Sequence, residues 1–267
     1  MFLYHNNNLT NQSTINIENR GFLFGDGVFE TCLIYNRKII NFAEHLKRLI
    51  SALEYLAINY DFSQLQQQAK NLVKINNLEH GILKIQISRD VGSIGYLPAQ
   101  NCSTTTILQN FLPRKIPKNI KLIISNRDLC GNFFFKSSNS LPYVLAKLDA
   151  QKKIAFDSIL INHNQHICET GSANIFWVKN GQIFTPKSDC KLVLGLIRNI
   201  ICQNFEVNLV AEGLLSLQEA DEVFITNSII LLKSIDTIEF ANNIIKNYQQ
   251  ITVAQKIASF LEKKLLL

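Results

Sequence analysis

The sequence predicts a mixed α/β (α+β) protein of two domains, and three observations lead to that prediction. Over the first hundred or so residues, strand-like and helix-like hydrophobic patterns alternate, whereas short strand-like segments dominate the second half. Pro113 and Pro117 stand between the two patterns and mark the expected linker. With 267 residues, 47% of them hydrophobic, the chain can bury a large core. We therefore expect a smaller N-terminal α/β domain over residues 1–116 and a larger, barrel-like C-terminal domain over residues 117–267.

In the N-terminal half, each expected element follows from the spacing of its apolar residues. Residues 28–35 predict a strand, and residues 81–89 alternate as a half-buried strand does. Residues 43–58 predict a helix with one buried stripe, because apolar residues recur there at intervals of three and four. A polar helix is expected over residues 62–73, and the glycine-containing stretch 90–104 is expected to be a loop. The stripe of the first helix comprises Leu46, Leu49, Ile50, Leu53 and Leu56.

The C-terminal half is expected to be built mainly of short strands. These segments are apolar and are separated by Asn or Gly turns, which favours a compact sheet or barrel. The expected strands are 121–125, 158–162, 173–179 and 182–185, and the expected helices are 141–153, 194–204 and 249–265.

Composition excludes several classes of function. Charged residues make up 18% of the chain, and the net charge of +6 is spread without a basic stripe, which argues against nucleic-acid binding. The first residues lack the features of a secretory signal, and no apolar stretch is long enough to span a membrane. We therefore expect a cytoplasmic protein with no nucleic-acid or membrane partner and no metal site. The cysteines are scattered without metal-ligand spacing and are expected to be reduced thiols: Cys32, Cys102, Cys130, Cys168, Cys190 and Cys202.

Three segments of the first 140 residues carry side chains suited to chemistry. Gly25 and Gly27 flank Asp26 and allow a sharp turn into a strand. Arg48 lies on the first amphipathic helix and offers a planar fork for a phosphate or carboxylate. Lys136 follows three phenylalanines, a setting that can desolvate an amine. Each segment alone has an ordinary structural interpretation: a turn, a solvated helix face and an exposed lysine.

Two further segments lie in the second half. Glu169 precedes a Gly-Ser turn and an apolar strand, and Gly195 opens a predicted helix whose first amides can bind an anion. An edge-strand carboxylate and a plain helix cap are the ordinary interpretations of these two residues.

Together, the order and spacing of these segments resemble the fold-type IV pyridoxal-phosphate enzymes, the class IV aminotransferase family. The motifs are FGDGVFET, EHLKRL, a lysine before N-x-L, ETGSANIFW and GLIR at the start of a helix, and they cover most of the chain. The resemblance implies a two-domain fold like that of D-amino-acid aminotransferase, with pyridoxal 5′-phosphate as cofactor. It also implies a small-molecule substrate and a homodimer with the site at the subunit interface.

The resemblance further implies roles for individual residues. Lys136 matches the Schiff-base lysine, and Glu169 matches the acid that faces the pyridine nitrogen and keeps it protonated. Tyr96 and Asn139 are the candidate substrate contacts. The phosphate contacts implied by the motifs are the Arg48 side chain, the backbone at Leu196 and Ile197, and the hydroxyl of Ser228.

Within the family, the chain most resembles the aminodeoxychorismate lyases, because Lys136, Asn139 and Leu141 follow their lysine spacing. Ile94 departs from the lyase pattern, which has an arginine there, and Ser140 departs from the branched-chain pattern, which has a tyrosine. A transaminase acting on D-amino acids or branched-chain amino acids is the alternative interpretation. A binding or scaffold protein on an inherited enzyme fold is the third.

Overall fold

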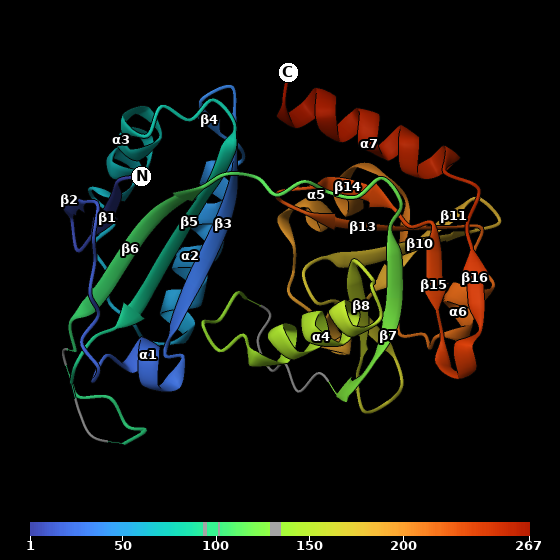
Figure 1. The fold of residues 1–267 in the computed structure, drawn as a ribbon, viewed down its shortest axis with the longest axis horizontal. Helices are drawn as coiled ribbons and strands as arrows, with labels where there is room; N and C mark the ends of the chain where they lie inside the picture. Colours follow the sequence, from blue (N-terminus) through green and yellow to red (C-terminus); the bar gives the residue numbers. More distant parts are fainter. Residues whose placement is uncertain (93–94, 101, 129–134) are drawn as a thin grey trace. The chain divides into compact units, whose positions relative to one another are not determined.

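The computed structural model describes residues 1–92, 95–100, 102–128 and 135–267, which fold as two compact units (Figure 1). The first unit comprises residues 1–114 and 135–140, and the second comprises residues 115–134 and 141–267. The expected domain boundary after residue 116 lies two residues beyond the first of these breaks. Residues 135–140, which include Lys136, were expected in the C-terminal domain but belong to the first unit.

The first unit is a six-stranded sheet with helices packed on it, in the strand order β2-β1-β6-β5-β3-β4. Its long strands β3 and β5 pair antiparallel from Gly27 opposite Ser88 to Ile34 opposite Gly81. The strands are β1 (Leu3–His5), β2 (Asn8–Thr10), β3 (Gly27–Tyr35), β4 (Lys38–Ile39), β5 (Gly81–Arg89) and β6 (Thr104–Phe111). The helices are α1 (Arg20–Phe24), α2 (Phe42–Tyr55) and α3 (Leu65–Ile75).

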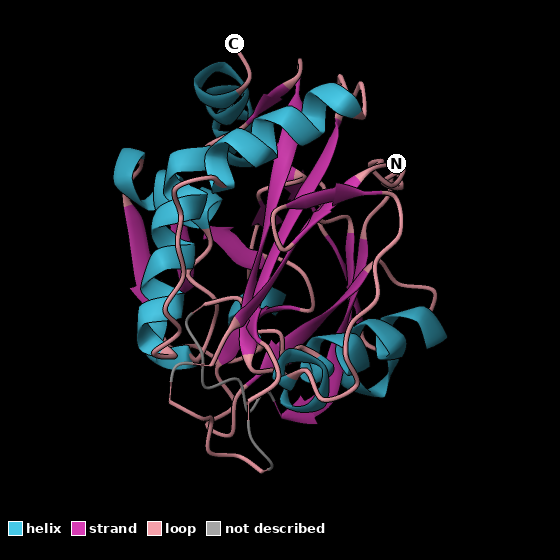
Figure 2. Cartoon of the chain, turned by 90° about the vertical axis from the view of Figure 1, so that its left-hand side faces the viewer, coloured by secondary structure: helices cyan, strands magenta, loops and turns pink. Residues whose placement is uncertain are grey.

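The two faces of this sheet have different environments. Alternate residues of β3, from Val28 to Ile34, are buried, and α2 and α3 lie against the sheet (Figure 2). Glu30 is on this helix-covered face, because it contacts side chains of α2. Phe29 therefore projects from the opposite face, since successive side chains of a strand point to opposite sides.

The second unit contains two five-stranded sheets, ordered β12-β11-β10-β13-β14 and β16-β15-β7-β8-β9. Their facing side chains form one hydrophobic core that includes Leu122, Ile159, Trp177 and Ile225. The strands are β7 (Lys121–Asp128), β8 (Asp157–Ile161), β9 (Ile167–Thr170), β10 (Asn174–Lys179), β11 (Gln182–Pro186), β12 (Val207–Val210), β13 (Glu222–Asn227), β14 (Leu231–Ser234), β15 (Thr237–Glu239) and β16 (Ile245–Asn247). The α-helices are α4 (Leu141–Lys152), α5 (Leu196–Asn204), α6 (Leu215–Gln218) and α7 (Thr252–Leu265).

Helices cover the outer faces of the second unit's two sheets. Helix α4 packs on β7 and β8, whereas α5 and α7 contact β13. The predicted α/β (α+β) class with two units is thus confirmed. Among the described residues, no helix combines the length and the hydrophobicity that crossing a membrane requires.

Candidate active site

The predicted site residues are divided between the two units. Arg48, Tyr96, Lys136 and Asn139 belong to the first unit. Glu169, Leu196, Ile197 and Ser228 belong to the second. Each unit therefore contains its own subset.

The Arg48 side chain pairs with a buried carboxylate and does not lie on a solvated helix face. Its Nε and Nη2 donate to the two carboxylate oxygens of Glu30 at 2.7 and 2.8 Å, and His45 Nδ1 lies 2.6 Å from Glu30 Oε2. Burial acts to raise the pKa of Glu30, but the charge and hydrogen bonds of Arg48, followed by those of His45, outweigh burial and lower it to about 2. The two-pronged contact fixes the plane of the guanidinium, while Glu30 takes two of its five N–H donors.

Lys136 lies on a short segment that pairs with the start of β3. Phe29 N donates to Lys136 O at 2.9 Å, Ser138 N donates to Gly27 O at 2.9 Å, and Val28 forms an isolated bridge with Ser137. The lysine Nζ lies 4.9 Å from the centroid of the Phe29 ring. Lys136, the predicted reactive lysine, is half-buried. The backbone of its segment is hydrogen-bonded to β3 of the first unit's sheet.

The turn before β3 requires glycine at position 25. Gly25 has φ +67°, and a Cβ added there would lie 2.9 Å from Asn139 N and 3.0 Å from Asn139 Cα. The FGDG turn and the segment after Lys136 thus approach too closely for any larger residue. The Asn139 side chain itself is exposed.

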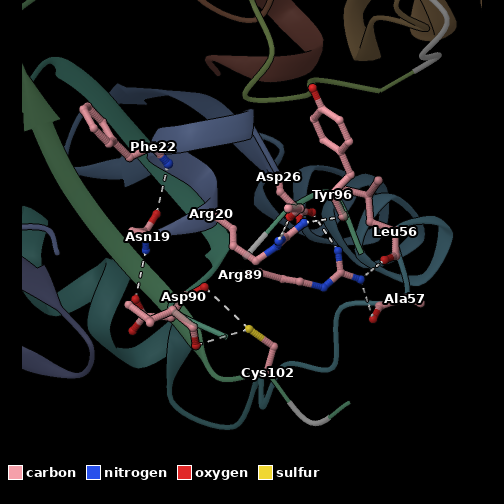
Figure 3. A network of polar contacts seen from close by, with 12 residues as sticks. Asn19, Arg20, Phe22, Asp26, Leu56, Ala57, Arg89, Asp90, Tyr96 and Cys102 are labelled. Atoms are coloured by element: carbon pink, nitrogen blue, oxygen red, sulfur yellow. Dashed lines mark hydrogen bonds and ion pairs between the residues drawn. The ribbon is translucent and has the colours of Figure 1, made fainter. Parts of the chain in front are cut away.

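Asp26 of the same turn anchors the loop that follows β5 (Figure 3). Its carboxylate accepts from Arg20 Nε at 3.0 Å and from Arg89 Nη1 at 2.7 Å, and Arg20 Nη2 donates to Tyr96 O at 2.6 Å. The Tyr96 backbone is thereby fixed, whereas its ring is 88% exposed and contacts Phe24 edge-on. Ile94, the departure noted in the sequence, lies outside the described residues.

In the second unit, Glu169 is a buried carboxylate surrounded by donors. Tyr143 Oη and Val193 N donate to Oε1 at 2.8 and 3.1 Å, and Asn174 Nδ2 donates to Oε2 at 3.2 Å. Burial, and then the Glu169 charge, raise the pKa of Tyr143, so that its phenol stays protonated and remains a donor. Because an ionised carboxylate only accepts hydrogen bonds, this shell of donors suits the charged form of the acid.

Asp157 stabilises the turn that follows Glu169 by accepting hydrogen bonds from it. Thr170 Oγ1 and Ser172 Oγ both donate to Asp157 Oδ2, at 3.0 and 2.6 Å, and Ser158 N donates to Oδ1 at 2.8 Å. Asp157 is fully buried. A buried carboxylate with three donors fixes the turn that connects Glu169 to its partner Asn174.

The N-terminus of α5 provides backbone donors close to Asn174. Gly195 is the N-cap and makes no side-chain capping bond, so within the described part of the chain no N-cap side chain satisfies the first-turn amides of Leu196 and Ile197. A Cβ on Gly195 would lie 2.0 Å from Asn174 Oδ1, so a larger residue there would have to displace this buried amide side chain. Such a helix start attracts an anion through its amides and its dipole.

Ser228 follows β13 in a turn organised by Asn227. The side-chain oxygen Oδ1 of Asn227 accepts from Ile229 N and Ile230 N, both at 2.9 Å. Thr226, just before this turn, is buried, and its hydroxyl has no hydrogen-bond partner among the described residues. Thr226 pairs across the strands with Asn174, which places both on one face of the sheet.

Comparison with known proteins identifies the family. The sequence profile described as amino-transferase class IV matches residues 27–238. The chain belongs to this family. Among its relatives are a D-alanine aminotransferase of Listeria monocytogenes, 30% identical over 88% of this chain and 86% of the relative, and an aminodeoxychorismate lyase of Bacillus subtilis, 29% identical over 83% and 80%. A similar solved structure, a putative 4-amino-4-deoxychorismate lyase from Legionella pneumophila, has a TM-score of 0.85 at 25% identity and covers 95% of this chain and 96% of that one.

As a class IV aminotransferase, the chain is a pyridoxal-phosphate-dependent enzyme. The described residues fit that cofactor. Within the described residues, the α5 amides without a side-chain cap, the small Gly195 at the helix start and the Thr226 hydroxyl without a hydrogen-bond partner suit a bound phosphate. The carboxylate of Glu169 suits a protonated ring nitrogen.

The sequence prediction missed the residues that support those of this class IV site. The sequence could have indicated Glu30 and His45 as buried polar residues. Glu30 is one of the alternate residues of β3 that are buried, and His45 lies four residues before the buried Leu49 on α2. Tyr143 and Asp157 carried no comparable signal. The role of each became apparent only from its hydrogen-bond partner in the structure.

Proposed function

We propose that this class IV enzyme is an aminodeoxychorismate lyase, which converts 4-amino-4-deoxychorismate to p-aminobenzoate and pyruvate in folate biosynthesis. The observation that carries the proposal is the segment from Lys136 to Leu141, which has the lyase spacing and Ser140 in place of the branched-chain tyrosine. Relatives named aminodeoxychorismate lyase in Bacillus subtilis and Vibrio harveyi, 29% and 26% identical, support it.

In this proposal the chain's residues divide the work of binding and proton transfer. Pyridoxal phosphate, when bound, supplies an electron sink for bond cleavage next to the substrate amine. Arg48, oriented by Glu30, binds the phosphate together with the Leu196 and Ile197 amides and the Ser228 hydroxyl. Glu169 accepts a hydrogen bond from the ring nitrogen.

Lys136 has two tasks in the same proposal. It would first hold the cofactor covalently; after the substrate amine has displaced it, the freed lysine amine would take the proton from the ring carbon that bears the substrate nitrogen as pyruvate leaves. Loss of that proton makes the product aromatic, which favours the reaction. The short β-paired segment keeps the amine in one place for both steps.

The test is incubation of the purified holoenzyme with 4-amino-4-deoxychorismate and no keto acid. We expect p-aminobenzoate and pyruvate in equal amounts, and we expect no product from the Lys136→Ala variant. Absence of pyruvate from an enzyme that is loaded with cofactor would exclude the lyase.

A transaminase acting on D-amino acids is the second candidate, because the Listeria D-alanine aminotransferase is 30% identical. A branched-chain transaminase belongs to the same class of reaction. Either one requires exchange of an amino group between an amino acid and a keto acid. Product formation only when both are supplied, from a panel of D-amino and branched-chain acids, would favour this candidate.

A further inference from the structure

The packing of the second unit brings Tyr143 of α4 to Glu169. Helix α4 lies on β7 and β8, and Tyr143 packs against Leu160 of β8 and Ala146 of its own helix. Leu160 pairs across the strands with Glu169 of β9, so that the two side chains project from the same face of the sheet. The phenol therefore reaches the neighbouring strand, where Tyr143 Oη donates to Glu169 Oε1 at 2.8 Å.

The direction of this hydrogen bond is fixed by the protonation of the phenol. Burial, and then the Glu169 charge, raise the pKa of Tyr143, so that the hydroxyl keeps its proton. An ionised carboxylate only accepts hydrogen bonds, and a bond from a hydroxyl to a carboxylate is roughly twice as strong as one between neutral groups. Tyr143 therefore stabilises the charged form of Glu169.

The phenol shares the carboxylate with two amide donors. Val193 N donates to Oε1 at 3.1 Å, and Asn174 Nδ2 donates to Oε2 at 3.2 Å. The Tyr143 bond, at 2.8 Å, is the shortest of these three. Because phenylalanine differs from tyrosine only in the hydroxyl, the effect of this one donor can be measured with the others in place.

We propose that Tyr143 is a positioning residue that acts through Glu169 and keeps the proton of the cofactor's ring nitrogen on that nitrogen. A proton between a pyridine nitrogen and a carboxylate can stay on the nitrogen or pass to the carboxylate oxygen, and a donor to the carboxylate favours the charged pair. Tyr143 thereby favours the form of the ring that withdraws electrons. The inference rests on the proposed pairing of Glu169 with the ring nitrogen, and it holds for a lyase and a transaminase alike.

Tyr143 lies outside the motifs on which the family resemblance depends. It stands between the lysine motif, which ends at Leu141, and ETGSANIFW, which begins at Glu169. Those motifs supply the acid, whereas a residue of α4 supplies the hydroxyl that donates to it. The electron-withdrawing strength of the ring is thus adjusted in this chain from a position that the motifs leave open.

The test measures where the shared proton lies. The holoenzyme is prepared at saturating cofactor with pyridoxal phosphate isotope-labelled at the ring nitrogen, and the NMR chemical shift of that nitrogen is recorded at neutral pH. We expect the wild type to show a protonated nitrogen, and Tyr143→Phe to move the chemical shift towards that of a neutral nitrogen. We also expect kcat for the accepted substrate to fall by about tenfold in Tyr143→Phe with little change in KM, which is the scale of one hydrogen bond to a charged group.

Two variants separate this role from a loss of stability. Tyr248→Phe removes another phenol of the same unit, which is buried and donates to Leu217 O at 2.7 Å, and it should leave the chemical shift of the ring nitrogen unchanged. Glu169→Gln removes the acid and should give a neutral nitrogen.

Four results would overturn the inference: a neutral nitrogen in the wild type, an unchanged chemical shift in Tyr143→Phe, an equal change in Tyr248→Phe, or a nitrogen that stays protonated in Glu169→Gln. Failure of the lyase proposal appears instead as absence of pyruvate from an enzyme in which Tyr143→Phe still moves the chemical shift.

Discussion

The buried acid Glu30 links the stability of the first unit to pH. Its pKa falls from the ordinary 4.5 to about 2 in the folded chain. A carboxyl with a lowered folded pKa contributes stability that is fully present above 4.5 and is lost as the pH falls through about 2. A shift of this size corresponds to about 3 kcal/mol. We expect Glu30→Gln to be less stable than the wild type by about that amount at pH 6, with the difference closing towards pH 2.

Denaturant unfolding of both proteins across this pH range measures the effect. Glu44→Gln is the matched control, because Glu44 is exposed on α2, the helix that carries Arg48 and His45, and pairs only with the exposed Lys47 among the described residues. It should follow the wild-type curve. Parallel curves for the wild type and Glu30→Gln would show that Glu30 is not the group responsible.

The residues that carry the proposed chemistry could be predicted from the sequence, but the residues that hold them could not. Lys136 and Glu169 stand in motifs of fixed order, so they could be found without coordinates. Tyr143 donates to the carboxylate of Glu169, 26 residues further along the chain. Asp157 accepts from Thr170, 13 residues further along. A buried polar side chain is stabilised by its partner, and no local pattern names that partner.

Among the elements, the turn after β9 controls the position of Glu169. Asp157 accepts both hydroxyl groups of that turn on one oxygen. In Asp157→Asn, an amide replaces one of the two carboxylate oxygens, so at least one buried donor loses its acceptor. We expect a loss of stability of about 1–3 kcal/mol. Because the same turn connects Glu169 to Asn174, we also expect weaker binding of pyridoxal phosphate.

Urea unfolding of the apoenzyme and a cofactor titration, made side by side, separate the two effects of Asp157→Asn. Asp189→Asn is the control, since Asp189 is exposed in the same unit. A variant that loses stability but binds the cofactor as tightly as the wild type would assign Asp157 to folding alone.

Strong hydrophobic periodicity decided which elements the sequence predicted. Strand β5 has the predicted bounds of residues 81–89, because buried and half-buried residues alternate over most of its length, from Gly81 to Ile87. The helix expected over residues 43–58 forms at Phe42–Tyr55, but its buried stripe includes His45 and Ala52 in addition to Leu49 and Leu53. Strand β13 was missed because five consecutive residues, polar Glu222 and Thr226 among them, are buried, so no alternation marks it.

At the scale of the whole molecule, the chain does not complete the first unit before it begins the second, because residues 135–140 belong to the first unit. The sequence marks the passage to the second unit by its prolines near residue 115. It gives no sign that residues 135–140 return to the first unit, because that return depends on backbone pairing with β3. Pairing between segments a hundred residues apart follows from tertiary contacts rather than from local propensity.

The family resemblance implies a homodimer, and the first unit carries an apolar surface suited to one. Phe22 and the adjacent Leu23 are 70% and 51% exposed on α1. Large apolar side chains grouped on a surface mark interaction sites. We expect a solution mass of twice 30.4 kDa by light scattering, and a monomer for Phe22→Asp.

Phe22→Asp should leave folding intact, because the ring is exposed. The control is Ile154→Asp in the second unit, where the side chain is 91% exposed and φ is +52°, a conformation that aspartate tolerates better than isoleucine. It should remain a dimer. If the wild type is monomeric, or if Ile154→Asp dissociates while Phe22→Asp does not, the surface on α1 is not the subunit interface, and the resemblance fails at the level of assembly.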